Sequence, residues 1–316
     1  MEKMRDIMIV TSRSDYSRNF WNAMRFDSQA ASMAYGALGS ESSLYLPKDS
    51  EERFRKLEME NGVIRNLASN LRMYDGSSHI WVYDSEDYSQ FVDEGDTIPG
   101  FDSIDEFSQI PVNAHKIASL VKVTAEFVRD SVFNVEDHIT RRMAKSFAMT
   151  EDRAFLTGTG IGEPTGLLHD EEGAEIADMV DSITYDDCIG LFFSVKPEYR
   201  KHAVWIMNDH TALALRKLKD DAGNYLWNNA DGTILGKRVA ICNDMPDAEA
   251  GSKPVLFGDL SYYWVIDRTP ASIKPLRELF AVNGQVGYVV KERLDAKLVR
   301  PEAVKVLAIS SEQENG

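Results

Sequence analysis

The sequence predicts an α+β fold built around one long helix, and three observations support this prediction. Helical periodicity runs from Asn134 to about Thr157, well beyond the mean helix length of about 11 to 12 residues. Beyond Pro164, shorter helical and strand-like runs alternate over about 100 residues. Residues 84–111, rich in Asp, Glu and Ser, lie between two strand-like runs. Such a long insertion is uncommon inside a compact domain and is usually functional or disordered.

The first 46 residues have few long periodic runs and many small or polar side chains. They predict an extended arm with one short helix, Asp15–Arg25, which Ser14 or Asp15 can cap. Three aromatic side chains of this arm have few neighbours in sequence to bury them, and we expect them to pack on another surface. They are Tyr16, Phe20 and Trp21.

Helical segments follow from Lys48 to Leu71, broken at Asn61-Gly62. Strands are expected at Ile80–Tyr83 and Ile117–Thr124, on either side of the acidic insertion. The later elements alternate. Helices are expected at Tyr185–Val195 and Asp209–Lys219, and strands at Ala203–Met207, Arg238–Cys242, Val255–Gly258, Tyr262–Asp267, Gln285–Lys291 and Ala303–Ile309.

The long helix has clear signals at both ends. Asn134 can cap its first turn, and the acidic residues just after Asn134 suit the positive end of the helix dipole. Its apolar face includes Ile139, Met143 and Phe147, and the same face continues through Thr150 or Glu151. The glycine-rich run 158–164, which ends in proline, stops the helix and predicts a turn.

Composition excludes several classes of protein. A formal net charge of −16 argues against binding of nucleic acid through a general basic surface, although it is compatible with a container around DNA. Two distant cysteines, Cys188 and Cys242, predict no disulfide framework and favour a reducing compartment. There is no signal-peptide pattern, and the apolar stretch Ile189–Val195 is far too short to span a bilayer.

No motif predicts catalysis, a cofactor or a metal. The glycines at 158, 160 and 162 superficially resemble a phosphate-binding loop, but they close a helix instead of opening one. The P-loop, zinc-protease and nucleophile-elbow motifs are absent from the sequence, and the six histidines have no metal-ligand spacing. A serine, histidine and aspartate brought together only by the fold stays open at this stage.

Many segments in order resemble one family. Residues 16–25, 44–47 and 63–68 are similar to its arm motif and to the segment that leads to its first strand, and 94–99 to its extended loop. The most specific stretch is 152–168, which resembles the end of the family's spine helix and its following turn. The other matching segments are 199–208, 218–220, 235–236, 257–260, Arg293 and Arg300-Pro301. Over nearly its whole length, the chain resembles the major capsid proteins of tailed bacteriophages with the Hong Kong 97-type fold.

The resemblance implies an architecture and a function. An N-terminal arm would take residues 1–46 and an extended loop 84–115, with an axial domain at 170–284. A peripheral domain with the spine helix would take 47–83, 116–169 and 285–316. Such a subunit assembles as pentamers and hexamers into an icosahedral virion shell that encloses double-stranded DNA without sequence-specific binding. The implied partners are a portal protein, a scaffolding protein or protease and a possible decoration protein, with assembly in the host cytoplasm and no membrane.

Two departures from the family matter. Some relatives cross-link their shells through a lysine of the extended loop and an asparagine, assisted by a glutamate. Residues 84–115 contain no lysine, Lys291 stands about where the assisting glutamate would be, and Asn283 lies nearby. We therefore expect a shell held by non-covalent contacts or by a separate cementing protein.

The chain also has no room before Tyr16 for the scaffolding segment of many relatives, so scaffolding would be a separate protein or the numbering starts at a processed end.

Two alternatives remain. An encapsulin-type nanocompartment would keep the fold and enclose an enzyme, whereas a cytoplasmic hydrolase would form a small oligomer with a buried cluster of perturbed titratable groups. A capsid subunit is expected to lack such a cluster. The side chains predicted to contact neighbouring subunits are Tyr16, Phe20, Trp21, Tyr88, Phe91 and Glu94.

Overall fold

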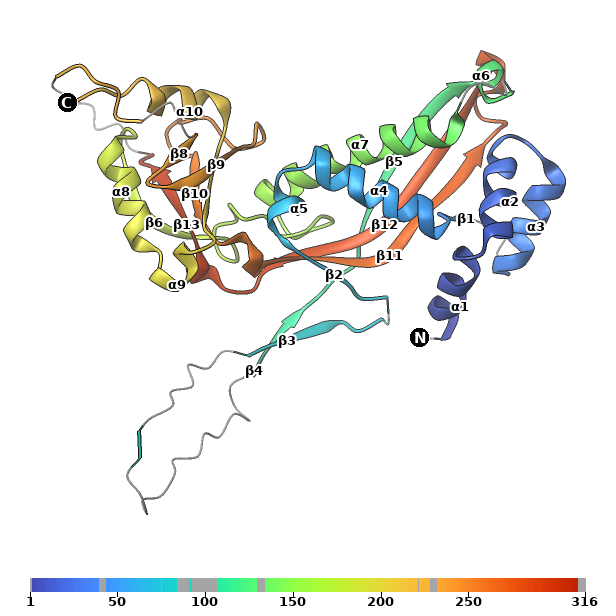
Figure 1. The fold of residues 1–316 in the computed structure, drawn as a ribbon, viewed down its shortest axis with the longest axis horizontal. Coiled ribbons are helices and arrows are strands. Elements are labelled where there is room, and N and C mark those ends of the chain that lie inside the picture. Colours follow the sequence, from blue (N-terminus) through green and yellow to red (C-terminus); the bar gives the residue numbers. More distant parts are fainter. Residues whose placement is uncertain are drawn as a thin grey trace.

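The structure is a computed structural model that describes residues 2–39, 44–74, 76–83, 91–92, 107–129, 134–220, 222–227 and 232–311. It is elongated, and a long sheet connects two bodies (Figure 1). One body holds a six-stranded sheet and the other holds the N-terminal helices, while a two-stranded hairpin projects away from both. No helix of the described residues is long and apolar enough to cross a membrane.

The N-terminal segment is helical, which corrects the prediction of an extended arm. The expected short helix is present as α2 (Ser14–Met24), but α1 (Glu2–Thr11) and α3 (Ser28–Leu38) accompany it. Asp27 caps α3, because its carboxylate accepts hydrogen bonds from the backbone amides of Gln29 and Ala30 at 2.9 and 3.0 Å. The alanine-rich sequence of α3 has high intrinsic helix propensity, which is a local signal for a helix within the segment predicted to be an extended arm.

The long sheet has the strand order β1-β11-β12-β5, and β2 pairs in parallel with β11. Its strands β11 and β12 run for 14 residues each, about twice the predicted lengths. Register shifts near Asp267 and Thr269 let β11 continue past the predicted end. The strands are β1 (Leu44–Tyr45), β2 (Ser69–Arg72), β5 (His115–Thr124), β11 (Tyr263–Leu276) and β12 (Gln285–Leu298).

Helices α4 (Lys48–Asn61), α5 (Ile64–Leu67) and α7 (Val135–Thr157) lie against one face of this sheet (Figure 1). The break between α4 and α5 and the helix-capping role of Asn134 confirm the sequence predictions, since Asn134 Oδ1 accepts from the backbone amide of Asp137 at 3.1 Å. Phe54 of α4 meets Phe147 of α7 edge to face, with ring centroids 5.6 Å apart. A short helix, α6 (Ala125–Arg129), follows β5 at its far end.

The second sheet has the order β6-β13-β10-β7-β9-β8, with helices α8 to α10 beside it. Trp205 and Phe257 stack within its core at a centroid distance of 4.2 Å. The expected elements of this region are confirmed, and strands β6 and β8 and the short helix α9 are additional. The bounds are β6 (Glu175–Val180), α8 (Tyr185–Ser194), α9 (Pro197–Arg200), β7 (Val204–Met207), α10 (Asp209–Arg216), β8 (Thr233–Ile234), β9 (Lys237–Ile241), β10 (Val255–Gly258), η1 (Leu260–Tyr262), η2 (Ala281–Asn283), η3 (Pro301–Ala303) and β13 (Val304–Ile309).

Strand pairing corrects the expected grouping of two segments. Strand β13 was grouped with the peripheral domain, but it pairs with β10 and β6 in the second sheet. Conversely, β11 was grouped with the axial domain, but it pairs with β12 in the long sheet. Both differences have one cause, because a strand joins the sheet where its partner lies, whatever its position along the chain. The remaining domain boundaries stay a prediction.

The projecting hairpin consists of β3 (His79–Tyr83) and β4 (Phe107–Pro111), paired antiparallel from His79–Pro111 to Tyr83–Phe107. Its root packs on a small cluster that includes Ile80, Val112 and Ile266. Figure 1 shows that the stem points away from the rest of the molecule. Between its strands, only Phe91 and Val92 belong to the described residues.

The glycine-rich segment after α7 folds as the expected turn. Gly158 donates its amide to the carbonyl of Ala154, and the chain then doubles back, with the amide of Gly166 bonded to the carbonyl of Gly158 at 2.9 Å. A Cβ at Gly158 would lie 2.2 Å from the carbonyl oxygen of Pro164. No helix follows within residues 158–174, which is unlike a phosphate-binding loop.

We expect Gly158→Ala to destabilise the chain by about 1–3 kcal/mol, because the added methyl group must displace backbone on both sides of the turn. The same substitution at Gly190, whose Cβ position is open and helical, should instead leave the stability unchanged or raise it slightly. Urea unfolding of both variants provides the measurement, and equal midpoints for the two would contradict this account.

Candidate functional site: a buried charge cluster and exposed assembly surfaces

Six charged side chains meet between the long sheet and the helices that cover it. All six are buried, none with more than 7% of its surface exposed, so they interact in a low-dielectric interior. They come from five elements that are far apart in the sequence, and the cluster therefore joins the helices to the sheet. Its members are Arg55 and Glu58 of α4, Arg65 of α5, Glu151 of α7, Asp267 of β11 and Glu292 of β12.

Arg65 is the most fully bonded member of the cluster. Its Nε and Nη2 donate to the two carboxylate oxygens of Glu151 at 2.7 and 2.8 Å, which is a bidentate pair. Its Nη1 donates to Asp267 Oδ1 at 3.1 Å. This one guanidinium therefore ties α5 to α7 and to β11.

Arg55 makes the corresponding contacts from α4. It donates to both oxygens of Glu292, at 3.2 and 2.6 Å, and to Glu58 Oε2 at 2.8 Å. Asp267 Oδ2 lies 3.7 Å from Arg55 Nη2, so this carboxylate stands between the two guanidiniums. The second oxygen of Glu58 and the Nε of Arg55 have no hydrogen-bond partner among the residues that the structure describes.

The cluster contains two more carboxyl groups than guanidiniums, and burial is the largest influence on the pKa values of three of its carboxyl groups. Burial raises the pKa of Glu292 to about 8, although Arg55 opposes the shift. Burial likewise raises the pKa of Glu151, against the opposing charge of Arg65. Burial would also raise the pKa of Asp267, but the two arginines outweigh it and hold this pKa below the ordinary value.

These shifts predict that the stability of the unassembled chain falls as the pH rises from about 4.5 to about 8. A group whose pKa is higher in the folded state binds its proton more tightly there. Its contribution to the free energy of unfolding is therefore complete below the pKa of the unfolded state and is lost as the pH rises through the pKa of the folded state. Urea unfolding at pH 6, 7, 8 and 9 measures this slope.

Glu292→Gln should flatten the slope, because a permanently neutral amide replaces the titrating group. As a control, Glu52→Gln on the exposed side of α4 should leave the slope unchanged. Equal slopes in the wild type and the Glu292→Gln variant would disprove the assignment.

The cluster corrects the expectation that a capsid-type subunit lacks buried perturbed carboxyl groups. Glu58, Glu151 and Glu292 approach closely enough that one oxygen of each lies within 4.8 Å of the others, a spacing that a metal ion could bridge. Here two guanidiniums already supply the positive charge. The arrangement holds the helices to the sheet, and each of its four carboxylates accepts a hydrogen bond from a guanidinium. The sequence signal was Glu151 itself, a charged residue on the predicted apolar face of the long helix.

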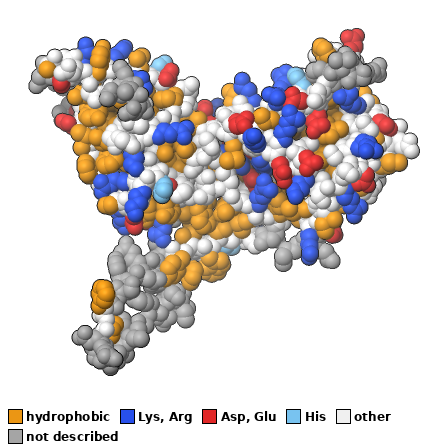
Figure 2. Space-filling model, in the orientation of Figure 1, with side chains coloured by type: hydrophobic (Ala, Val, Ile, Leu, Met, Phe, Trp, Pro, Cys, Tyr) orange, Lys and Arg blue, Asp and Glu red, His pale blue; other side chains and the backbone are white. Residues whose placement is uncertain are grey.

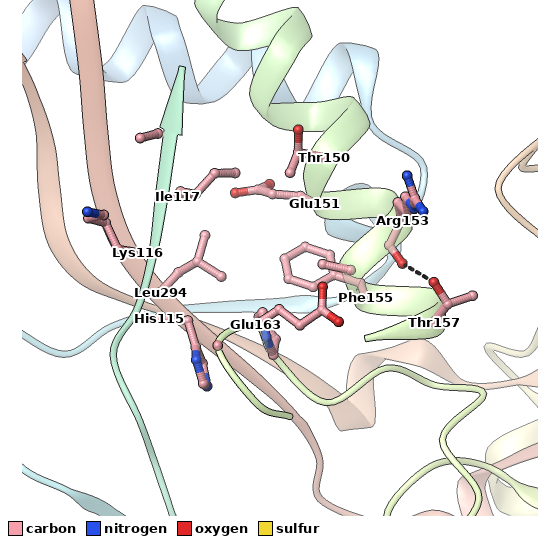
Figure 3. Close-up of a pocket in the computed structure, with 14 residues that line it drawn as sticks. His115, Lys116, Ile117, Thr150, Glu151, Arg153, Phe155, Thr157, Glu163 and Leu294 are labelled. Carbon is pink, nitrogen blue, oxygen red and sulfur yellow. Dashed lines mark hydrogen bonds between the residues drawn. The ribbon is translucent and has the colours of Figure 1, made fainter. Parts of the chain in front are cut away.

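A pocket of about 510 Å³ lies beside the cluster, between the end of α7, the glycine turn and strands β5 and β12. Figure 3 shows Ile117 and Leu294 pointing into it from the strands, Phe155 from α7 and Glu163 from the turn. Glu151 also borders the pocket, but both of its oxygens accept from Arg65.

The recorded contacts of the described histidines do not form a Ser–His–Asp triad. Ser78 Oγ lies 2.8 Å from His79 Nδ1, but no carboxylate is recorded against that ring among the described residues. His115 lies 3.6 Å from Asp295 and His210 lies 3.1 Å from Asp247, but no serine hydroxyl is bonded to either ring among the described residues. The hydrolase alternative consequently has no support in this part of the chain.

Tyr16, Phe20 and Trp21 were predicted at a subunit contact because few residues near them in the sequence could bury them. The structure corrects this reason. Tyr16 and Phe20 have 2% and 0% of their surface exposed, because they pack inside the chain's own core. The Tyr16 hydroxyl donates to the carbonyl of Tyr45 at 2.7 Å. Trp21 is half-buried, and its indole N–H donates to Ser50 Oγ at 3.2 Å. Some residues that bury these three aromatic side chains come from segments that are distant in the sequence but close in space.

The predicted loop contacts have different outcomes. Phe91 is fully exposed, as expected of a side chain without local partners. Tyr88 and Glu94 lie outside the described residues. The role of all three in subunit contacts stays a prediction.

Exposed apolar side chains lie on several sides of the molecule. Figure 2 shows hydrophobic side chains over the hairpin root and over the side formed by β6 and α8. Solvent-exposed apolar groups of this kind mark contact surfaces when they gather together. The exposed apolar residues of the hairpin are Trp81 and Phe107, and those of the β6–α8 side are Ile176, Met179 and Phe193. Those at the far end of the long sheet are Phe127, Leu279 and Val282, and those around α10 are Leu213, Tyr225 and Leu235.

A family model described as the phage capsid family matches residues 43–309, which is most of the chain. The chain belongs to the phage capsid family. This confirms the family resemblance, and it accounts for a structure with a long sheet, a projecting hairpin and exposed apolar surfaces. The family consists of structural capsid proteins, and a member is part of the virion.

Two curated relatives are described as a probable major capsid protein and a major capsid protein. A probable major capsid protein of Mycobacterium phage D29 is 26% identical over 186 residues, which are 57% of each chain. The major capsid protein of Escherichia phage T5 is 26% identical over 115 residues, 36% of this chain and 23% of that protein. The match thus spans little more than half of the first relative and about a quarter of the second.

Solved capsid structures share the fold. The capsid of an empty GTA particle is 26% identical with a TM-score of 0.66, covering 79% of this chain and 90% of that one. The capsid of the native GTA particle is 25% identical with a TM-score of 0.63, covering 78% and 89%. A structure from Microbacterium phage Oxtober96 has a TM-score of 0.59 at 18% identity, covering 79% and 91%, and shows the fold alone. The predicted Hong Kong 97-type α+β fold is confirmed.

Proposed function

We propose that this phage capsid protein assembles with copies of itself, as pentamers and hexamers, into an icosahedral shell around double-stranded DNA. The observation that carries the proposal is the family match over residues 43–309, together with exposed apolar side chains in four separate regions of the subunit. A shell subunit needs contacts on several sides, whereas a small closed oligomer needs only one or two.

The partners in assembly are part of the same proposal. The shell would act with a portal protein, with a separate scaffolding protein or protease, and with a decoration protein. It would form in the host cytoplasm. DNA would be enclosed without sequence-specific binding, in keeping with a net charge of −16. Residues 84–115 contain no lysine, which supports a shell without covalent cross-links through that loop.

Negative-stain electron microscopy and sedimentation velocity of the purified chain at near-neutral pH test this function. Closed shells or tubes tens of nanometres across are expected, with or without a co-expressed scaffold. Nucleic acid in the particles would support the phage assignment, and a packaged enzyme would favour the nanocompartment instead. A single species below about ten subunits under all these conditions would overturn the proposal.

A further inference from the structure

Helix α7 packs its apolar side on the long sheet, and its other side is exposed along most of its length. The exposed charged side chains of residues 141–157 are all cations. The two acidic residues of this stretch, Glu151 and Asp152, are buried. An exposed run of positive charge is unexpected in a chain with a net charge of −16.

Three of these cations lie along one side of the helix. Arg142, Lys145, Met149 and Arg153 follow one another at intervals of three or four residues, which places them on the same side. The charges extend over about 16 Å, because an α-helix rises about 1.5 Å per residue. No ion pair is recorded for the three cations among the described residues. We define the basic stripe as Arg142, Lys145 and Arg153.

The recorded partners of nearby acidic side chains lie outside the basic stripe. On the neighbouring helix α4, Glu52 lies 4.0 Å from Lys48 and Glu60 lies 3.9 Å from Lys56. Asp137, in the first turn of α7, accepts hydrogen bonds from two other arginines. Figure 2 shows basic and acidic side chains interspersed over α4 and α7. These acidic groups neutralise other cations, so the stripe keeps its positive charge.

We propose that the basic stripe contacts the phosphates of the enclosed DNA, which places α7 on the DNA side of the shell. The inference rests on the proposed function and adds the face of the subunit that meets the duplex. About 16 Å of duplex carries about ten phosphate charges, so three cations along α7 have enough partners. Phosphate contacts carry no sequence information, in keeping with a shell that encloses DNA of any sequence.

The composition of the stripe favours DNA over an acidic protein as its partner. Two of its three cations are arginines, whose planar guanidinium matches a phosphate in two parallel hydrogen bonds. A protein interface needs an apolar centre. The stripe offers one exposed apolar side chain, Met149, which is 61% exposed.

Neutralisation of two stripe residues tests the contact. A stripe variant carries Arg142→Gln and Lys145→Gln, which keep helix propensity at exposed positions. The probe is a fluorescent duplex of about 30 base pairs, titrated with the unassembled chain between about 25 and 150 mM NaCl and followed by anisotropy. The stripe variant should bind at least about tenfold more weakly than the wild type. Its plot of log affinity against log salt should be less steep by about two.

Two further variants with the same or similar loss of charge provide the comparison. Lys201→Gln with Arg238→Gln removes one lysine and one arginine from exposed positions beside the second sheet, and it should bind the duplex as the wild type does. Lys274→Gln with Lys291→Gln acts on the opposite face of the long sheet, because the adjacent Ile273 and Val290 point to the helices. It should also leave the binding unchanged.

The measurement needs no shell, so a failure of the wild type to assemble counts against the proposed function alone. Equal affinities and salt slopes for the wild type and the stripe variant would overturn the inference. A loss of binding only in the variant of Lys274 and Lys291 would place the DNA on the opposite face. Binding of poly-glutamate, but not of the duplex, would make an acidic protein segment the partner of the stripe.

Discussion

Arg65→Ala is expected to lower the free energy of unfolding of the unassembled chain by about 3–5 kcal/mol. The substitution removes the bidentate partner of Glu151 and one of the two guanidiniums that neutralise Asp267. Both carboxyl groups are almost completely buried, so water cannot replace the lost donors without opening the packing of α5 and α7. The loss is a large part of the stability of a typical domain, about 5–15 kcal/mol.

Arg53→Ala is the matched control for this measurement. Arg53 lies on the neighbouring helix α4 and pairs with Asp137, but its side chain is 42% exposed. We therefore expect a loss below about 1 kcal/mol. Urea unfolding of both variants, followed by circular dichroism at constant pH, gives the comparison. A similar small loss for Arg65→Ala would show that the buried cluster does not hold the helices to the sheet.

Phe20→Ala is expected to destabilise the unassembled chain by about 3–5 kcal/mol, because it leaves a cavity in a fully buried part of the core. Phe20 packs edge to face on Trp21, with ring centroids 4.9 Å apart, and lies 6.0 Å from Tyr16. If these aromatics acted only at subunit contacts, the same substitution would impair assembly and leave the stability of the isolated chain unchanged.

Met33→Ala on helix α3 provides the comparison, since half of the Met33 side chain is exposed. It should change the stability by no more than about 0.5 kcal/mol. Thermal unfolding of the unassembled chain, combined with the sedimentation assay for assembly, separates the two roles. Normal stability of Phe20→Ala with defective assembly would restore the original interpretation of the arm.

The sequence by itself determined the local elements with strong signals. The helix cap at Asn134, the break at Asn61-Gly62 and the glycine turn after Thr157 all act within a few residues, and all three occur where they were predicted. The order of many short motifs was enough to predict the capsid family, because a family resemblance draws on the whole chain at once. Local sequence also placed the acidic insertion directly after the strand that ends at Tyr83, but it missed β4, which occupies residues 107–111 of the segment predicted to be a loop.

The tertiary structure alone decided which distant residues meet. Arg55 and Glu292 are separated by 237 residues, and only the packing of α4 on β12 makes them partners. Burial gave Phe20 a core role that its polar neighbours in sequence concealed. Pairing likewise placed β13 in the second sheet and β11 in the first. In each case the reason is physical: burial, strand register and charge balance depend on neighbours in space.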